Sequence, residues 1–359
     1  EGIRWLGTSI ASLSTLQSVL VVGSNLRKDH PLFAQRIRQA ARHGCQVIAL
    51  DSVERDWAIP VKHLLKHAAS QWVLALGGIA AAVAQEKGVA GPAGSFVIDD
   101  AATAVARSLM AGERKAVLLG NAAAHHAQAA QLLALANWIG EHTGATVGYL
   151  TEAANTVGAQ FVGAHPVKGG LNAAQMLSGG LKAVLLLNNE PVHDSSAGAR
   201  ATDALSGAEM VVTLSPFKAN MEFSDVLLPI APFTETSGSF INAEGRLQSF
   251  HAVVRPLGDT RPAWKVLRVL ANMLEIPGFD FETSQDVLVR ATNAAPGAFS
   301  QIDATQLSNA VTGGVTASVS GAVGEPVVAS IYQLDGLVRR SPSLQLTADA
   351  RMAREEVAA

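Results

Sequence analysis

Cysteine, aromatic residues and charge are all scarce in this sequence. Of its 359 residues one is a cysteine, 5% are aromatic and 16% are charged. A single cysteine excludes an internal disulfide, a four-cysteine zinc site and an iron–sulfur cluster held by four thiolates of this chain. Cys45 stands at the start of an apolar run, so we interpret it as a buried structural thiol in a reducing compartment. The hydrophobic share of 48% predicts a sizeable core of aliphatic side chains.

Strong net charge and long apolar runs are missing as well. The formal net charge is −3, without a basic stripe interleaved with aromatics, so we expect no nucleic acid as a partner. Apolar runs reach about five to eight residues, against roughly 20 for a membrane-spanning helix, so we expect no direct membrane insertion. The sequence starts at Glu1 without an initiator methionine or a signal-peptide profile, and we expect it to be part of a longer chain.

The common motifs for phosphate binding and nucleophilic catalysis do not occur. Neither G-x-x-x-x-G-K-[ST], G-x-G-x-x-G nor G-x-S-x-G is found. His63 and His67 lie four apart on an expected helix, but no third ligand is near, and a solvated helix face is favoured. His125 and His126 are adjacent and cannot share a helix face. The sequence therefore predicts no catalytic residue and no metal site.

Short apolar runs alternate with segments of helical periodicity, which predicts a doubly wound, mostly parallel α/β sheet. A helix begins at Pro31, and Asp99 or Asp100 is the expected N-cap of another. Strands are expected at residues 18–23, 47–50, 72–76, 95–98, 116–119, 147–150, 183–187, 210–214 and 226–230. Further helices are expected at residues 60–68, 79–86, 100–111, 124–142, 172–178, 197–206, 264–274 and 284–292. Nine strands are many for one sheet, so two lobes are expected.

The pattern divides the chain into four parts. Residues 1–150 form a first, nucleotide-binding-like α/β lobe, and residues 151–293 form a second one. Residues 294–330, rich in small residues, form a flexible connector with one edge strand near 325–332. Residues 331–359 form a C-terminal tail that ends in a charged helix.

Polar segments follow four of the expected strands. They contain Gly23-Ser24-Asn25, Asp51, residues 188–194 and residues 234–246. Open α/β sheets bind ligands beyond the carboxyl ends of their strands, and such groups suit a nucleotide-like molecule, with Asp51 accepting from ribose or guanine. The alternative is a set of surface turns that satisfy their own backbone. Gly77-Gly78 also have two interpretations: a phosphate-binding loop at a helix start, or a tight strand-to-helix turn.

Several of these segments resemble, in the same order, motifs of molybdopterin oxidoreductases. Residues 19–51 resemble the nucleotide-binding part of that family, and residues 169–174 and Asn189-Glu190-Pro191 follow. The most specific match is residues 235–248. Together with residues 335–345, it looks most like the large iron–sulfur (G) subunits of bacterial NADH:quinone oxidoreductases. The resemblance covers about residues 18–275 and 331–347.

The resemblance implies two sheet lobes around a vestigial cofactor pocket. Cofactor-binding relatives often differ at Leu26, Ser52-Val53, Asn189 and Gly245, and these changes remove groups that would meet the dinucleotide. The implied pocket consists of Gly23, Ser24, Asn25, Asp51, Asn172, Asn189, Glu235, Gly238, Asn242 and Arg246.

The implied role is that of a non-catalytic scaffold without a cofactor of its own. The full-length subunit would carry 4Fe-4S and 2Fe-2S clusters, with other subunits of the complex I peripheral arm as partners, on the cytoplasmic side of the bacterial inner membrane. One alternative is an active formate dehydrogenase-like enzyme with a molybdenum or tungsten molybdopterin guanine dinucleotide. Another is a free-standing nucleotide-binding module.

Overall fold

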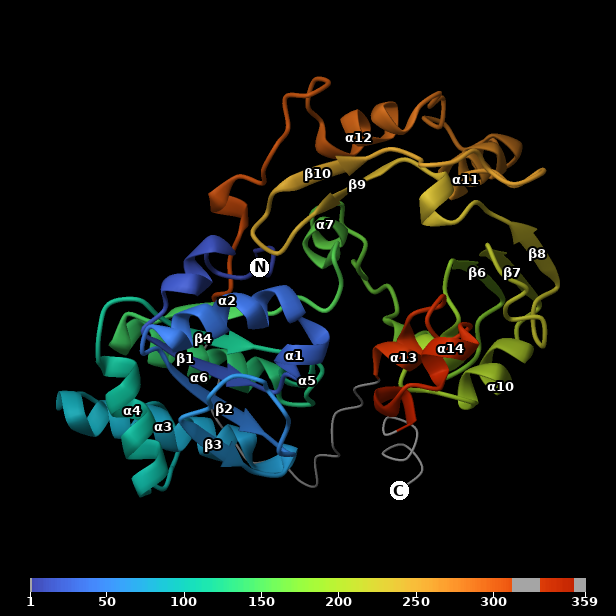
Figure 1. Cartoon of the computed structure of the whole chain (residues 1–359). Coiled ribbons are helices and arrows are strands. Elements are labelled where there is room, and N and C mark those ends of the chain that lie inside the picture. The colour runs from blue at the N-terminus through green and yellow to red at the C-terminus, as the bar shows by residue number, and fades with distance from the viewer. Residues whose placement is uncertain (1, 312–329, 352–359) are drawn as a thin grey trace. The chain divides into compact units, whose positions relative to one another are not determined.

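The computed structural model describes residues 2–311 and 330–351, in two compact units that each take up segments distant in sequence (Figure 1). Unit 1 contains Glu1–Phe161, Ile241–Arg246 and Gln301–Ile331, and unit 2 contains Val162–Phe240, Leu247–Ser300 and Tyr332–Ala359. Part of the expected connector, residues 301–311, therefore belongs to unit 1. Residues 312–329, which include most of the expected edge strand, and the end of the expected terminal helix lie outside the described residues.

Unit 1 is built on a parallel five-stranded sheet of order β3-β2-β1-β4-β5. Its strands are β1 Ser18–Val22, β2 Gln46–Asp51, β3 His63–Lys66, β4 Lys115–Leu119 and β5 Thr146–Tyr149. Its helices are η1 Ala11–Thr15, α1 Leu26–Asp29, α2 Pro31–Arg42, η2 Ala69–Gln71, α3 Trp72–Lys87, α4 Asp100–Met110, α5 Asn121–Ala124, α6 Ala129–Thr143, α7 Thr156–Phe161 and η4 Ala304–Gln306. Asp99 caps α4 as expected, since its carboxylate accepts the Ala102 N–H at 2.7 Å.

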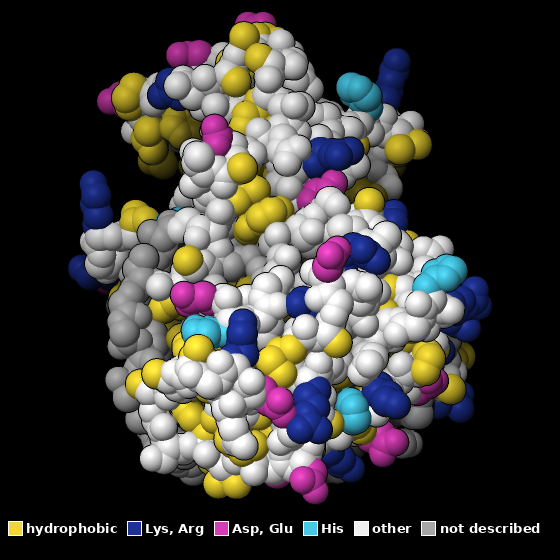
Figure 2. All heavy atoms as spheres, turned by 90° about the vertical axis from the view of Figure 1, so that its left-hand side faces the viewer, with side chains coloured by type: hydrophobic (Ala, Val, Ile, Leu, Met, Phe, Trp, Pro, Cys, Tyr) yellow, Lys and Arg dark blue, Asp and Glu magenta, His cyan; other side chains and the backbone are white. Residues whose placement is uncertain are grey.

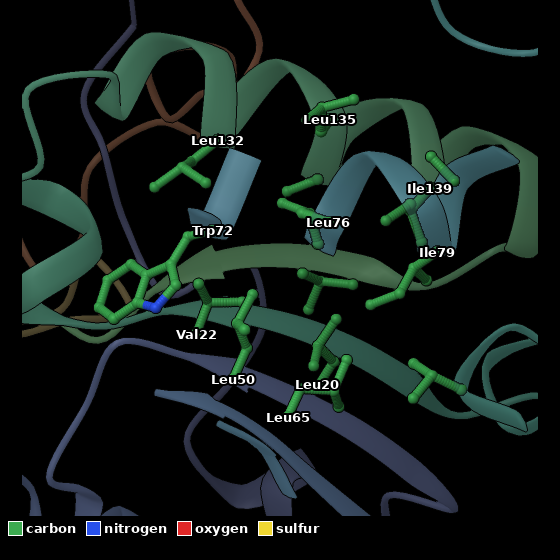
Figure 3. Packing of buried hydrophobic residues seen from close by; sticks show 14 of the residues in the cluster. Leu20, Val22, Leu50, Leu65, Trp72, Leu76, Ile79, Leu132, Leu135 and Ile139 are labelled. Carbon is green, nitrogen blue, oxygen red and sulfur yellow. The ribbon is translucent and has the colours of Figure 1, made fainter. Parts of the chain in front are cut away.

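The two faces of this sheet are covered by different helices, as a doubly wound fold requires. In β1, Leu20 and Val22 lie in the cluster formed with α3, α4 and α6, whereas Val19 and Val21 pack with α2. Figure 3 shows the first face, where Leu20, Val22, Leu50 and Leu65 of the strands meet Trp72, Leu76 and Ile79 of α3 and Leu132, Leu135 and Ile139 of α6. The expected α/β architecture is confirmed.

Three expected elements of unit 1 are wrong. Residues 72–76 form the first turns of α3 and not a strand. A short apolar run without helical periodicity cannot be told from a buried strand by its pattern alone. Residues 63–66 form strand β3 and not a helix, so His63 and His67 do not share a helix face. Residues 95–98 form no strand.

Gly77 and Gly78 lie inside α3, so neither a phosphate cradle nor a strand-to-helix turn is correct. A Cβ on Gly77 would come within 2.1 Å of the Phe96 ring, and one on Gly78 within 2.6 Å of the Val97 carbonyl oxygen. The two glycines therefore let residues 96–97 pass close over the helix, which explains their occurrence despite their poor helix propensity.

The open edge of β5 is covered by residues near Trp5 and near Asn309. The Trp5 carbonyl accepts the Tyr149 N–H at 2.9 Å. The Asn309 amide donates to the carbonyls of Val147 at 2.9 Å and of Trp5 at 3.0 Å. These bonds satisfy edge groups that would otherwise face water.

Unit 2 contains a parallel three-stranded sheet of order β6-β7-β8 and the strands of a hairpin, β9 and β10. Its strands are β6 Ala183–Leu187, β7 Met210–Ser215, β8 Val226–Pro229, β9 Gly238–Ile241 and β10 Leu247–Phe250. Its helices are α8 Ala173–Met176, α9 Pro191–Asp194, α10 Arg200–Ser206, η3 Phe233–Glu235, α11 Ala263–Met273, α12 Ser284–Thr292, α13 Ile331–Leu334, which begins at the unit boundary, and α14 Pro342–Gln345. None of the helices in the described part of the chain is both long and apolar enough to cross a membrane.

Candidate functional site

The loops that follow β1 and β4 lie in direct contact, at the point where the strand order of unit 1 reverses. A Cβ on Gly120 would lie 2.3 Å from the Cβ of Ser24. Gly23 has a φ of +60°, and a Cβ there would come within 2.7 Å of the Trp72 ring and 2.8 Å of the Ala123 nitrogen. Ser24 is 3% exposed. The loops after β1 and β4 therefore approach each other so closely that a side chain at Gly120 or Gly23 would clash.

Asp51 ends β2 and is already engaged by its own loop. One carboxylate oxygen accepts the Ser52 N–H at 2.7 Å, and the other accepts Nε of Arg55 at 2.8 Å. The side chain is 2% exposed. Both oxygens of this carboxylate are therefore engaged by the loop that follows β2.

The loop after β1 is held in a similar way. The Asn25 N–H donates to the Asp29 carboxylate at 3.1 Å, and burial raises the pKa of Asp29. Arg27 forms an ion pair with Asp56 of the loop after β2. The loops after β1 and β2 therefore bind each other at the carboxyl edge of the sheet.

Three polar atoms near these strand ends are buried without a hydrogen-bond partner among the described residues: Oγ of Ser24, Oδ1 of Asn121 and Nδ1 of His30. Burial lowers the pKa of His30, and its Nε2 lies 2.8 Å from the Thr151 carbonyl, so the neutral ring carries its proton on Nε2. The strand ends of unit 1 thus hold three buried polar atoms that the described chain leaves without a partner.

Asn242 and Arg246 lie at the tip of the β9–β10 hairpin. The Asn242 side-chain oxygen accepts the N–H groups of Glu244 at 3.1 Å and of Arg246 at 2.9 Å. Gly245 has a φ of +85°, which glycine adopts without strain. Asn242 therefore shapes the turn, and the Arg246 guanidinium lies 3.4 Å from the Glu244 carboxylate.

The same tip is anchored within unit 1. The Glu244 carboxylate accepts the Ile10 N–H at 2.7 Å, and the Gly245 carbonyl accepts the Ile302 N–H at 2.9 Å. A Cβ on Gly245 would lie 3.0 Å from a methyl group of Leu307. The segment that the sequence singled out as a ligand loop thus packs against other parts of its own unit.

The remaining predicted residues of unit 2 also have structural contacts. Asn172 caps α8 through a reciprocal capping box. The Glu235 carboxylate accepts the Leu257 N–H at 3.0 Å. A Cβ on Gly238 would come within 2.7 Å of the Phe250 ring across the hairpin. Within unit 2, these three residues are therefore engaged by their own surroundings.

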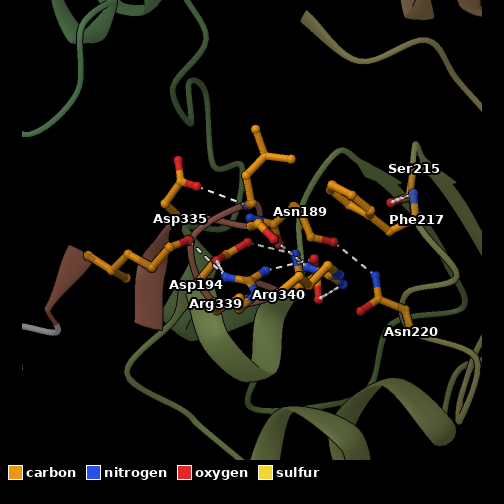
Figure 4. A network of polar contacts seen from close by, with 12 residues as sticks. Asn189, Asp194, Ser215, Phe217, Asn220, Asp335, Arg339 and Arg340 are labelled. Carbon is orange, nitrogen blue, oxygen red and sulfur yellow. Dashed lines mark hydrogen bonds and ion pairs between the residues drawn. The ribbon is translucent and has the colours of Figure 1, made fainter. Parts of the chain in front are cut away.

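A concentrated polar network occurs in unit 2, at the loop after β6 (Figure 4). The two Glu190 carboxylate oxygens lie 2.7 Å from Arg339 and 2.8 Å from Arg340. Arg339 also lies 3.3 Å from Asp194. The Asn189 carbonyl accepts the Asn220 side chain at 2.8 Å. The sequence motifs singled out Asn189-Glu190-Pro191 and residues 335–345 separately. Only the opposite charges of these two segments indicated that they would contact each other.

The Glu190 side chain is 13% exposed and that of Arg339 is 11% exposed, so the pair is largely shielded from water. Burial by itself raises the pKa of Glu190, but the hydrogen bonds and charges of the two arginines outweigh it and hold the pKa below its ordinary value. Lowering the pH is therefore expected to remove a stabilisation that is fully present above the unfolded pKa of about 4.5, and to remove it progressively as the pH falls through the folded pKa. Denaturant midpoints of the wild type and of Glu190→Gln should converge toward low pH, and parallel pH profiles would contradict this expectation.

Other candidate chemistry is sparse in the described residues. Cys45 is buried as expected, and burial raises its pKa to about 11, so it is a poor nucleophile. Within residues 2–311 and 330–351, no three His, Cys, Asp or Glu side chains gather to hold a metal ion. A hollow of about 720 Å³ in unit 1 is lined by Trp5, Trp138 and residues 307–311, among others, and by none of the predicted site residues. On the face drawn in Figure 2, acidic and basic side chains are interspersed.

Comparisons with known proteins agree with this fold. The family model described as Molybdopterin oxidoreductase matches residues 2–273. The chain is 12% identical to acetylene hydratase from Pelobacter acetylenicus, with a TM-score of 0.53 over 79% of this chain and 53% of that one. The chain therefore belongs to the molybdopterin oxidoreductase family.

Relatives with curated descriptions match short parts of the chain. A probable oxidoreductase, YjgC, of Bacillus subtilis (strain 168) is 37% identical over 75 residues, which make up 21% of this chain and 8% of that protein. A putative formate dehydrogenase of Staphylococcus aureus (strain bovine RF122 / ET3-1) is 42% identical over 59 residues, or 16% of this chain and 6% of that protein. The matched parts thus span less than a tenth of either relative.

Proposed function

We propose that this chain is a non-catalytic scaffold portion of the large iron–sulfur subunit of a bacterial NADH:quinone oxidoreductase. The observation that carries the proposal is that the Asp51 carboxylate already accepts hydrogen bonds from its own chain. Its carboxylate accepts Arg55 at 2.8 Å and a backbone N–H at 2.7 Å. The loop after β4 also runs close to Ser24, since a Cβ on Gly120 would lie 2.3 Å from the Ser24 Cβ. A carboxylate that is engaged by its own chain supports the scaffold proposal, in which this portion does no pterin chemistry itself.

In this proposal, the whole assembly passes electrons from NADH to quinone. The 4Fe-4S and 2Fe-2S clusters belong to the full-length subunit, and the partners are other subunits of the peripheral arm on the cytoplasmic side of the inner membrane. The segment 335–345, whose sequence resembles that subunit, contributes Arg339 and Arg340 to the Glu190 network.

A second candidate is a formate dehydrogenase-like enzyme, and the name of the Staphylococcus aureus relative favours it. This enzyme would hold a molybdopterin guanine dinucleotide, and Asp51 would have to exchange Arg55 for the ligand. If the chain were a simple nucleotide-binding module, it would bind GDP, and this binding would depend on Asp51.

Two measurements separate these candidates. Metal analysis of the intact subunit, expressed with molybdate and tungstate, is expected to find far less than one molybdenum or tungsten atom per chain. Calorimetry with GDP is expected to give no saturable heat with the wild type or with Asp51→Ala. Stoichiometric molybdenum or tungsten would replace the scaffold proposal by the enzyme, and GDP binding that Asp51→Ala abolishes would replace it by the nucleotide module.

A further inference from the structure

Residues 335–345, called here the di-arginine segment, form a compact structure through their own hydrogen bonds. The Asp335 carboxylate accepts the N–H groups of Leu337 at 2.9 Å and of Val338 at 2.8 Å. The Gln345 amide donates to the Val338 carbonyl at 3.0 Å. The Arg339 guanidinium also donates to the carbonyls of Gln333 at 3.0 Å and Leu334 at 2.8 Å, and the Arg340 guanidinium donates to that of Gly336 at 3.1 Å. These bonds orient the two arginines, so little side-chain freedom is lost when they bind.

The surface that receives these arginines consists of Glu190, Asp194 and Phe217, and we call it the acidic–aromatic site. Glu190 bonds one arginine with each carboxylate oxygen, at 2.7 and 2.8 Å. The Arg340 guanidinium lies over the Phe217 ring, 4.2 Å from its centroid. A planar guanidinium both stacks on a ring and donates in the plane of a carboxylate, which an ammonium group does not. The chemistry of the site therefore suits arginine better than lysine.

The position of the site is that of a ligand site. Glu190 follows β6 and Phe217 follows β7, two adjacent parallel strands, so both lie beyond the carboxyl end of the sheet. Figure 4 shows Arg339 and Arg340 lying among the side chains of these two loops. The di-arginine segment fills the place that a ligand takes in an open α/β sheet.

We propose that the acidic–aromatic site is a binding site for a peptide with two adjacent arginines, and that the di-arginine segment is its resident intramolecular occupant. The segment then acts as a strap, and any other ligand of this sheet edge must displace it. The proposal rests on contacts within unit 2 and not on the proposed function. Because a tethered occupant acts at a local concentration of order millimolar, a free peptide competes with it only at comparable concentrations.

The direct test uses the full chain with Arg339→Ala and Arg340→Ala, which vacate the site. A fluorescent peptide of residues 332–347 is expected to bind this variant saturably and at least tenfold more tightly than a matched peptide with both arginines replaced by lysine. Adding Glu190→Gln to the vacated chain is expected to weaken binding at least tenfold. Equal binding of the arginine and lysine peptides, or no binding by a folded variant, would overturn the proposal.

A second measurement needs no destabilising change. In the wild-type chain, millimolar arginine peptide is expected to speed hydrogen exchange across residues 335–345 several-fold, because displacement releases the strap. The lysine peptide at the same concentration is the control. Unchanged exchange with the arginine peptide means that the segment is a fixed part of the fold and not a displaceable ligand.

Discussion

Replacing Trp72 by alanine is expected to lower the free energy of unfolding by about 3–5 kcal/mol, the usual loss for a buried tryptophan. Its side chain is fully buried at the start of α3, and its indole N–H donates to the His67 carbonyl at 2.9 Å. The ring lies beneath the loop after β1, where it would meet a Cβ on Gly23 at 2.7 Å. Alanine would leave both a cavity and an unpaired carbonyl under that loop.

Denaturant titration followed by circular dichroism measures this loss. Trp72→Phe is expected to fall between wild type and alanine, because it keeps most of the packing and loses the hydrogen bond. Leu32→Ala, at a side chain that is 76% exposed, is the matched control and should change stability by less than about 0.5 kcal/mol. A loss at Trp72 no larger than at Leu32 would contradict the packing described for the sheet.

The second large effect is expected for Glu190→Ala, which should destabilise unit 2 toward the lower end of the about 3–5 kcal/mol range of broken buried ion pairs. The substitution removes the carboxylate that both Arg339 and Arg340 contact. Arg339 is 11% exposed, and its charge would then be compensated only by the more distant Asp194. The cost arises mainly from the uncompensated charge and less from the lost contact.

Two variants make this measurement specific. Glu209→Ala removes an exposed carboxylate from the same unit and should have little effect. Adding Arg339→Met to Glu190→Ala removes the stranded charge and should recover part of the loss. If Glu190→Ala lowered the free energy of unfolding no more than Glu209→Ala does, the arginine network would contribute little to stability.

The regular elements were predictable where hydrophobic periodicity was unambiguous. The expected strand at 183–187 and helix at 284–292 match β6 and α12 residue for residue. The sequence misled at Trp72–Lys87, whose ten buried residues surround the helix and erase its periodicity. It also misled at His63–Lys66, where the expected helix is a four-residue strand, too short for a clear alternation. The local hydrophobic pattern was sufficient to predict β6 and α12. The structure of residues 63–66 and 72–87 depends instead on tertiary packing.

The candidate site was less predictable, because the same residue types serve turns and ligands. Asn242, Asn172 and Glu235 were selected for their polar side chains, yet each accepts hydrogen bonds from its own chain. Whether a polar group is free depends on partners that are distant in sequence. Arg339 meets Glu190 across some 150 residues, which no local pattern encodes.

The covering of the β5 edge has a consequence for synthesis on the ribosome. Asn309, which donates to Val147, is translated 162 residues later. At roughly 5–20 residues per second, the nascent sheet waits on the order of ten seconds for its last hydrogen bonds. During that interval Trp5, which is translated earlier, is already available to accept the Tyr149 N–H, whereas the Val147 carbonyl still lacks its Asn309 donor. The part of the β5 edge around Val147 is therefore the part exposed to pairing with a neighbouring strand during synthesis.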